Sequence, residues 1–135
     1  MSASSDILAT AAFLLVLAAG LWLVAVAGLM ALRPGLFLRL LGLTASSWRV
    51  NVAEQGPRLI AGAALIVHAP ASKLPALFEA GGWFVVASSV CLLAVPLRWH
   101  AGYAIWWARR LKPAAVRAIA PFSAAAGAGL IYAAW

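Results

Sequence analysis

Charged residues are scarce in this chain, and acidic residues are almost absent. Only 10% of its 135 residues are charged, and aspartate and glutamate together number 3, while 66% of the residues are hydrophobic. A soluble domain of this length needs far more polar surface to face water. The apolar residues also form runs of the length that a membrane-spanning helix needs, about 20 residues. The composition therefore indicates one integral membrane domain over residues 1–135, with no room for a separate soluble domain.

Few residues are available for catalysis or metal binding. The three carboxylates, Asp6, Glu54 and Glu79, fall at the ends of apolar runs, whereas proton-coupled transporters rely on ionisable groups deep in the membrane. His68 and His100 are expected near opposite faces of the bilayer, too far apart to be paired ligands of one haem. We therefore predict no catalytic residue, no metal site and no cofactor. A small four-helix transporter stays open as an alternative because its length and number of spans would fit.

The chain also lacks a cysteine pair and a basic N-terminal segment. Cys91 is alone, which excludes an intrachain disulfide, and in its apolar run we expect it to pack as a small hydrophobe. A secretory signal begins with basic residues and has a short apolar core, whereas this chain begins with MSASSD and a longer apolar run. We therefore expect the first apolar run to be retained as a helix.

Four apolar runs are long enough to be membrane spans. The first ends at Arg33-Pro34-Gly35, where a charge, a helix breaker and a flexible residue follow one another, and the third ends at Pro96. We predict an all-α membrane protein, a four-transmembrane-helix bundle with interfacial amphipathic segments between helices 1 and 2 and between helices 3 and 4. The expected spans are residues 7–32, 52–69, 76–95 and 115–135.

The positive charges are divided unequally among the connections. The second connection, between Pro70 and Pro75, has only Lys73. By the positive-inside rule the other two connections face the cytoplasm, and both termini lie outside. We predict a multi-pass protein of a bacterial inner membrane with periplasmic termini, and we assign the net charge of +7 to anionic lipid rather than to nucleic acid. The other nine cations are Arg33, Arg39, Arg49 and Arg58 in the first connection and Arg98, Arg109, Arg110, Lys112 and Arg117 in the third.

The stretch RWHAGYAIWWARRLKP, residues 98–113, combines cations with aromatic rings. On a helical wheel its rings form a stripe with cations on one flank, the pattern of a helix lying in the headgroup layer. Rings then reach the acyl boundary while cations contact lipid phosphates. The predicted headgroup-binding residues are Arg98, Trp99, Tyr103, Trp106, Trp107, Arg109, Arg110 and Lys112.

Small residues recur at helical spacing in the predicted spans. Ser123 and Gly127 are four residues apart, as are Ala125 and Gly129, and such pairs let helix backbones approach closely in lipid. Together with Gly62 these residues are expected to pack helices within the chain, or alternatively to form a homo-oligomer or an interface with a larger membrane complex.

Two segments also suggest an internal duplication. AGAALI at 61–66 is similar to AGAGLI at 126–131, and the same offset of 65 residues relates Leu32-Arg33 to Leu97-Arg98. If the duplication is real, each unit is a helical hairpin with a basic interfacial bend. Two such units keep the same orientation in the membrane and form a parallel repeat.

The segment WRVNVAEQGPRL, residues 48–59, carries the densest polar group. Asn51, Glu54 and Arg58 lie three and four residues apart and share one helix face. They are interpreted as a helix start, in which Asn51 caps the helix and Glu54 pairs with Arg58.

The pattern Asn51-Val-Ala-Glu54-Gln-Gly-Pro57 also resembles the N-x-x-E-x-x-P start of the second helix in the MAPEG family of membrane glutathione transferases and eicosanoid enzymes. Four spans and similar length fit that family. The resemblance implies a trimeric enzyme that acts on lipophilic substrates and holds glutathione with Asn51, Glu54 and Arg58.

The first prediction for function is non-enzymatic. We expect a small structural or accessory membrane protein that packs through small-residue helix faces and binds anionic lipid headgroups or a larger complex. The glutathione-dependent enzyme is the alternative, and the transporter is the second alternative.

Overall fold

The computed structural model describes residues 2–135, which are almost entirely helical and contain no strand. The prediction of an all-α chain is therefore confirmed. Prolines begin three of the helices, where a missing N–H costs nothing because the first N–H groups of a helix have no partner within it. The elements are α1 (Ala3–Leu32), α2 (Pro34–Gly42), α3 (Trp48–His68), the 3-10 turn η1 (Ala69–Ala71), α4 (Pro75–Ala94), α5 (Leu97–Arg110) and α6 (Pro113–Ala134).

Three of the helices, α1, α4 and α6, are long and apolar enough to cross a membrane. The fourth long helix, α3, has 21 residues but carries charge in its first three turns, at Arg49, Glu54 and Arg58. Four spans are therefore not confirmed. The two segments predicted to be interfacial are both helices, α2 and α5.

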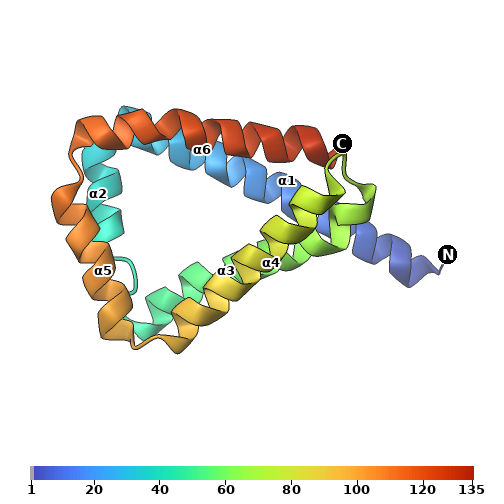
Figure 1. The fold of residues 1–135 in the computed structure, drawn as a ribbon, viewed down its shortest axis with the longest axis horizontal. Helices are drawn as coiled ribbons and strands as arrows, with labels where there is room; N and C mark the ends of the chain where they lie inside the picture. Colours follow the sequence, from blue (N-terminus) through green and yellow to red (C-terminus); the bar gives the residue numbers. More distant parts are fainter. Residues whose placement is uncertain (1) are drawn as a thin grey trace.

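The helices lie in three antiparallel pairs, α1 with α6, α2 with α5 and α3 with α4. Figure 1 shows these pairs as the three sides of a triangle. We call the α2–α5 side the base, and the end where the other two pairs converge the apex. The C-terminus lies at the apex, and the first turns of α1 project beyond it (Figure 1). The predicted four-helix bundle is not confirmed, because the two long pairs diverge from the apex towards the base.

The two halves of the chain repeat the same order of helices: a long helix, a short helix and a long helix. The first half is α1 to α3, and the second half is α4 to α6. If α1, α2 and α3 are exchanged with α4, α5 and α6, the α1–α6 pair becomes the α4–α3 pair and the α2–α5 pair maps onto itself. The two halves are therefore related by an approximate two-fold symmetry. Both halves run from the apex to the base and back, so they form a parallel repeat.

Close glycine contacts mark equivalent places in the two long pairs. A Cβ at Gly127 would overlap the carbonyl oxygen of Gly20 and would lie 3.0 Å from the backbone nitrogen of Val24. A Cβ at Gly62 would lie 3.0 Å from the carbonyl oxygen of Gly82. Gly62 and Gly127 are the glycines that the 65-residue offset relates, and the structure supports an internal duplication at these crossings.

The offset of 65 residues holds for α3 and α6 but not for the rest of the repeat. Leu32 ends α1 whereas Leu97 begins α5, so these two residues are not equivalent. The crossing contacts instead relate Gly20 to Gly82, an offset of 62 residues. The connections between the long helices, residues 33–47 and 95–112, differ in length by three residues, which accounts for the changed offset.

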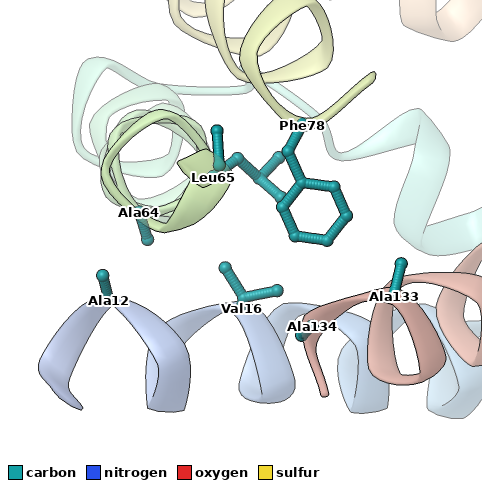
Figure 2. Packing of buried hydrophobic residues seen from close by; sticks show 8 residues of the cluster. Ala12, Val16, Ala64, Leu65, Phe78, Ala133 and Ala134 are labelled. Atoms are coloured by element: carbon teal, nitrogen blue, oxygen red, sulfur yellow. The ribbon is translucent and has the colours of Figure 1, made fainter. Parts of the chain in front are cut away.

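A small apolar core closes the apex. Ala12 and Val16 of α1 face Ala64 of α3, and Phe78 of α4 covers the same cluster (Figure 2). His68 is buried beside it, and its Nε2 lies 2.9 Å from the carbonyl oxygen of Ala134. The short side chains allow α1 and α3 to pack closely.

Helix α3 begins earlier than the sequence predicts. Its N-terminal cap is Ser47, whose hydroxyl accepts a hydrogen bond from the Val50 N–H at 3.2 Å. The prediction that Asn51 caps this helix is wrong, because Asn51 lies within the first turn and is fully buried.

Candidate functional site

Helix α5 turns its aromatic stripe outwards at the base. Trp99, Tyr103 and Trp106 are 62%, 65% and 46% exposed, whereas His100 and Ala104 on the opposite face are buried. A helix with exposed rings on one face and a buried opposite face is suited to lie on a membrane boundary.

The cations of α5 gather around one of these rings. The guanidinium of Arg110 lies 4.1 Å from the centroid of the Trp106 ring, a cation–π contact. Arg109, Arg110 and Trp106 line a shallow pocket of about 390 Å³ together with Gly102 and Ile105. Two arginines beside an apolar wall provide donors for a phosphate and a surface for the carbons next to it.

The remaining predicted headgroup residues lie along α5 and just beyond its end. Trp107 makes edge contacts with Trp106 and Tyr103, at centroid distances of 4.9 Å and 6.2 Å. Arg98 is exposed in the first turn of α5, and Lys112 is exposed between α5 and α6 rather than within α5.

Helix α2 extends this surface. A Cβ at Gly42 would lie 3.7 Å from the Cβ of Ala108, so the two short helices are in direct contact. The base and the adjoining helix ends carry most of the positive charge. These cations are Arg33, Arg39, Arg49, Arg98, Arg109, Arg110, Lys112 and Arg117.

A second polar feature is buried where α3, α4 and α5 meet. We call Asn51, Gln55, Ser89 and His100 the polar corner; all four are buried. Asn51 Nδ2 donates to the carbonyl oxygen of Leu92 at 3.5 Å, and its Oδ1 accepts from His100 Nδ1 at 3.1 Å. The Asn51 amide therefore ties α3 to both α4 and α5.

Two atoms of the polar corner have no hydrogen-bond partner among the described residues, Gln55 Oε1 and Ser89 Oγ. Both side chains are at least nine-tenths buried. Helices α3 and α4 are antiparallel, and Asn51 lies opposite Leu92. Gln55 is one turn further along α3 and Ser89 is about one turn earlier on α4, so the two side chains lie at the same height along the helix pair. Each unpaired polar atom costs roughly 1–3 kcal/mol.

Comparison of the two halves of the chain shows that only the first has polar residues at the α3 positions of the polar corner. The offset of 65 residues relates Asn51 to Val116 and Gln55 to Ala120, and these two residues are buried among apolar side chains. The polar corner is therefore a local departure from the two-fold symmetry rather than a requirement of the fold.

The three residues predicted to hold glutathione have partners within the chain. Glu54 Oε2 accepts from the Ala45 N–H at 3.2 Å, and Arg58 donates to the Ser88 hydroxyl at 3.0 Å. In residues 2–135 Glu54 and Arg58 thus bind separate partners instead of pairing with each other as predicted. The glutathione alternative stays a prediction, which a rise in melting temperature with millimolar glutathione would support.

The small residues predicted to pack helices have different surroundings. Gly62 and Gly127 lie at the two crossings, and the Ser123 hydroxyl donates to the Leu23 carbonyl oxygen at 2.8 Å. A Cβ at Gly129 would meet nothing within 4 Å.

Sequence reasoning missed Gln55 and Ser89. The signal for Gln55 was present, because Asn51, Gln55 and Gly62 are spaced by four and seven residues and share one helix face. Ser89 lies in an apolar run, where nothing in the sequence separates a buried serine from an exposed one.

No known protein family, curated protein or solved structure matches this chain.

Proposed function

We propose that this chain is a small, non-catalytic protein of a bacterial inner membrane, which binds anionic lipid headgroups through its base. In this proposal four helices cross the membrane, α2 and α5 lie in the cytoplasmic headgroup layer, and both termini are periplasmic. The protein acts as a structural or accessory subunit, as a homo-oligomer or within a larger complex.

The aromatic and cationic surface of α5 carries this proposal. Trp99, Tyr103 and Trp106 are exposed beside a pocket lined by Arg109 and Arg110. Large exposed rings are unfavourable in water but suit the boundary between acyl chains and headgroups. Each cation near an anionic membrane contributes about 1 kcal/mol to binding.

The placement of α3 as a fourth span is supported by the hydrogen bonds of two of its charged side chains. Glu54 accepts from Ala45 in the connection at the base, and Arg58 reaches Ser88 on α4. Polar groups that face a partner helix are tolerated at membrane depth because they find hydrogen bonds there. Because α3 pairs with the apolar α4, the two can cross together.

The double variant Arg109→Gln, Arg110→Gln should bind anionic lipid about 30-fold more weakly than the wild type. The reason is the loss of two cations worth about 1 kcal/mol each. Native mass spectrometry with titrated phosphatidylglycerol measures this affinity.

The matched control is Arg109→Lys, Arg110→Lys, which keeps the charge and should retain most of the binding. Added salt should weaken wild-type binding, because exposed charges are screened. Unchanged affinity of the glutamine variant would contradict the proposed headgroup site.

A further inference from the structure

The polar corner is one departure from the two-fold symmetry of the chain. A groove between α4 and α6 is a second. In the first half α1 packs closely on α3, whereas the backbones of the equivalent helices of the described chain, α4 and α6, hardly approach each other and meet only through side chains of the apex core. A groove of about 410 Å³ lies between them instead. Its size falls within the range of pockets that hold small molecules, about 300–1,000 Å³.

The lining of this α4–α6 groove is apolar. Leu77, Phe78 and Phe84 line it from α4, and Gly129 and Leu130 from α6. By the repeat, Gly129 is equivalent to Ala64, which is buried against α1 in the first half. A Cβ at Gly129 would meet nothing within 4 Å, so the groove has room beside the glycine.

A cation, Lys73, lies beside the apex end of the groove without lining it. Lys73 precedes the groove residue Leu74, and its N–H donates to the carbonyl oxygen of Ala133, another groove residue, at 2.8 Å. Its ammonium donates to the carbonyl oxygen of Tyr132 at 2.9 Å and lies 3.9 Å from the Tyr132 ring centroid. These contacts hold the exposed ammonium in place, and the side of it that faces away from Tyr132 is left for a ligand.

No carboxylate of the described chain opposes this cation from within the groove. The nearest acidic residue in the sequence is Glu79 of α4. At 100° per residue Glu79 lies on the side of α4 opposite Leu77, Gly81 and Phe84, which line the groove. The apolar groove therefore has a single positive charge beside its apex end.

We propose that the α4–α6 groove binds one phospholipid, whose acyl chain lies along Leu77, Phe84 and Gly129 and whose phosphate contacts Lys73. An apolar groove with one cation beside its end matches the chemistry of a phospholipid, which joins apolar chains to one phosphate. A second copy of this chain would need no phosphate partner at Lys73. The site is separate from the base, and it holds whether or not α5 binds headgroups.

The experiment compares variants that fill the groove with variants that remove its charge. All are made in the Arg109→Gln, Arg110→Gln background, so that binding at the base does not mask the groove. Native mass spectrometry in mild detergent measures the number and affinity of bound 16:0–18:1 phosphatidylglycerol molecules. Gly129→Leu fills the groove with a side chain. The control Gly28→Leu adds the same side chain at a helix position where a Cβ meets nothing within 4 Å.

We expect Gly129→Leu to bind one lipid fewer than its parent, and Gly28→Leu to bind the same number. Lys73→Gln should bind the lipid about 5-fold more weakly, because one cation is lost. Equal lipid counts for Gly129→Leu and its parent would overturn the proposal. A parent that is dimeric and becomes monomeric in Gly129→Leu would also overturn it, because a second copy would then occupy the groove.

Discussion

Replacing Gly127 with alanine should destabilise the protein by about 3 kcal/mol, the upper part of the range for overpacked sites. The added Cβ would overlap the carbonyl oxygen of Gly20 and approach the backbone nitrogen of Val24 to 3.0 Å. Backbone atoms cannot rotate away as a side chain can, so α1 and α6 must separate. The measurement is the difference in the free energy of unfolding between the variant and the wild type. It is obtained by titrating SDS into detergent micelles and following the helix content by circular dichroism.

The matched control is Gly129→Ala, two residues further along the same helix. Nothing lies within 4 Å of a Cβ at Gly129, so the substitution should stabilise the helix by up to about 1 kcal/mol because alanine is the better helix former. Gly62→Ala should have a smaller cost than Gly127→Ala, since its nearest neighbour is the side chain of Val86. Equal effects at Gly127 and Gly129 would contradict the close crossing of α1 and α6.

Substitutions in the polar corner should have opposite signs. Asn51→Val installs the residue that the other half has at Val116, but it leaves the His100 Nδ1–H and the Leu92 carbonyl without their partner. We expect a loss of about 2–3 kcal/mol. Ser89→Ala removes a buried hydroxyl that has no partner in the described chain and should stabilise the protein by about 1 kcal/mol.

The reciprocal substitution Val116→Asn is the matched control for the polar corner. It places an amide of similar size among Met30, Ala120 and other apolar side chains, and should cost about 1–3 kcal/mol. All variants are measured by the same SDS titration. A loss of stability in Ser89→Ala would contradict the unpaired state of its hydroxyl and would indicate that a bound water or ligand occupies the corner.

The sequence predicts the order of the helices well, because prolines and charges mark the places where helices end. Pro34, Pro96 and Pro113 stand at or beside the breaks that separate α2 and α5 from the long helices. The amphipathic pattern of residues 98–110 also predicts which face of α5 is exposed, since Trp99, Tyr103 and Trp106 repeat at helical spacing.

The pairing of the helices could not be predicted. Four long helices can pack as a bundle or as two diverging pairs, because the hydrophobic pattern does not specify which helix faces contact each other. Glycine spacing at Gly62 and Gly127 indicates close approach but not the partner helix. Gly129 shows this limit, since its spacing from Ala125 suggests a helix contact and the structure has an open groove there.

The polar corner was partly visible in the sequence. Asn51 was singled out, but as a helix cap, because a polar residue after an interfacial segment usually marks a helix start. Its burial depends on His100, which is 49 residues away and belongs to a different helix. Long-range partners of this kind are set by the packing of α3, α4 and α5, which local spacing does not reveal.

The central claim is that the two halves fold back on each other, with α2 beside α5 at the base. A cysteine pair tests it most directly: Gly42→Cys with Ala108→Cys, in a Cys91→Ser background. A Cβ at Gly42 would lie 3.7 Å from the Cβ of Ala108, and disulfides join Cβ atoms about 3.5–4.5 Å apart. Mild oxidation in membranes should therefore give an intramolecular disulfide, seen as a reducible shift of the monomer on a gel. Free thiols in the double variant, or crosslinks between chains alone, would contradict the pairing of the halves.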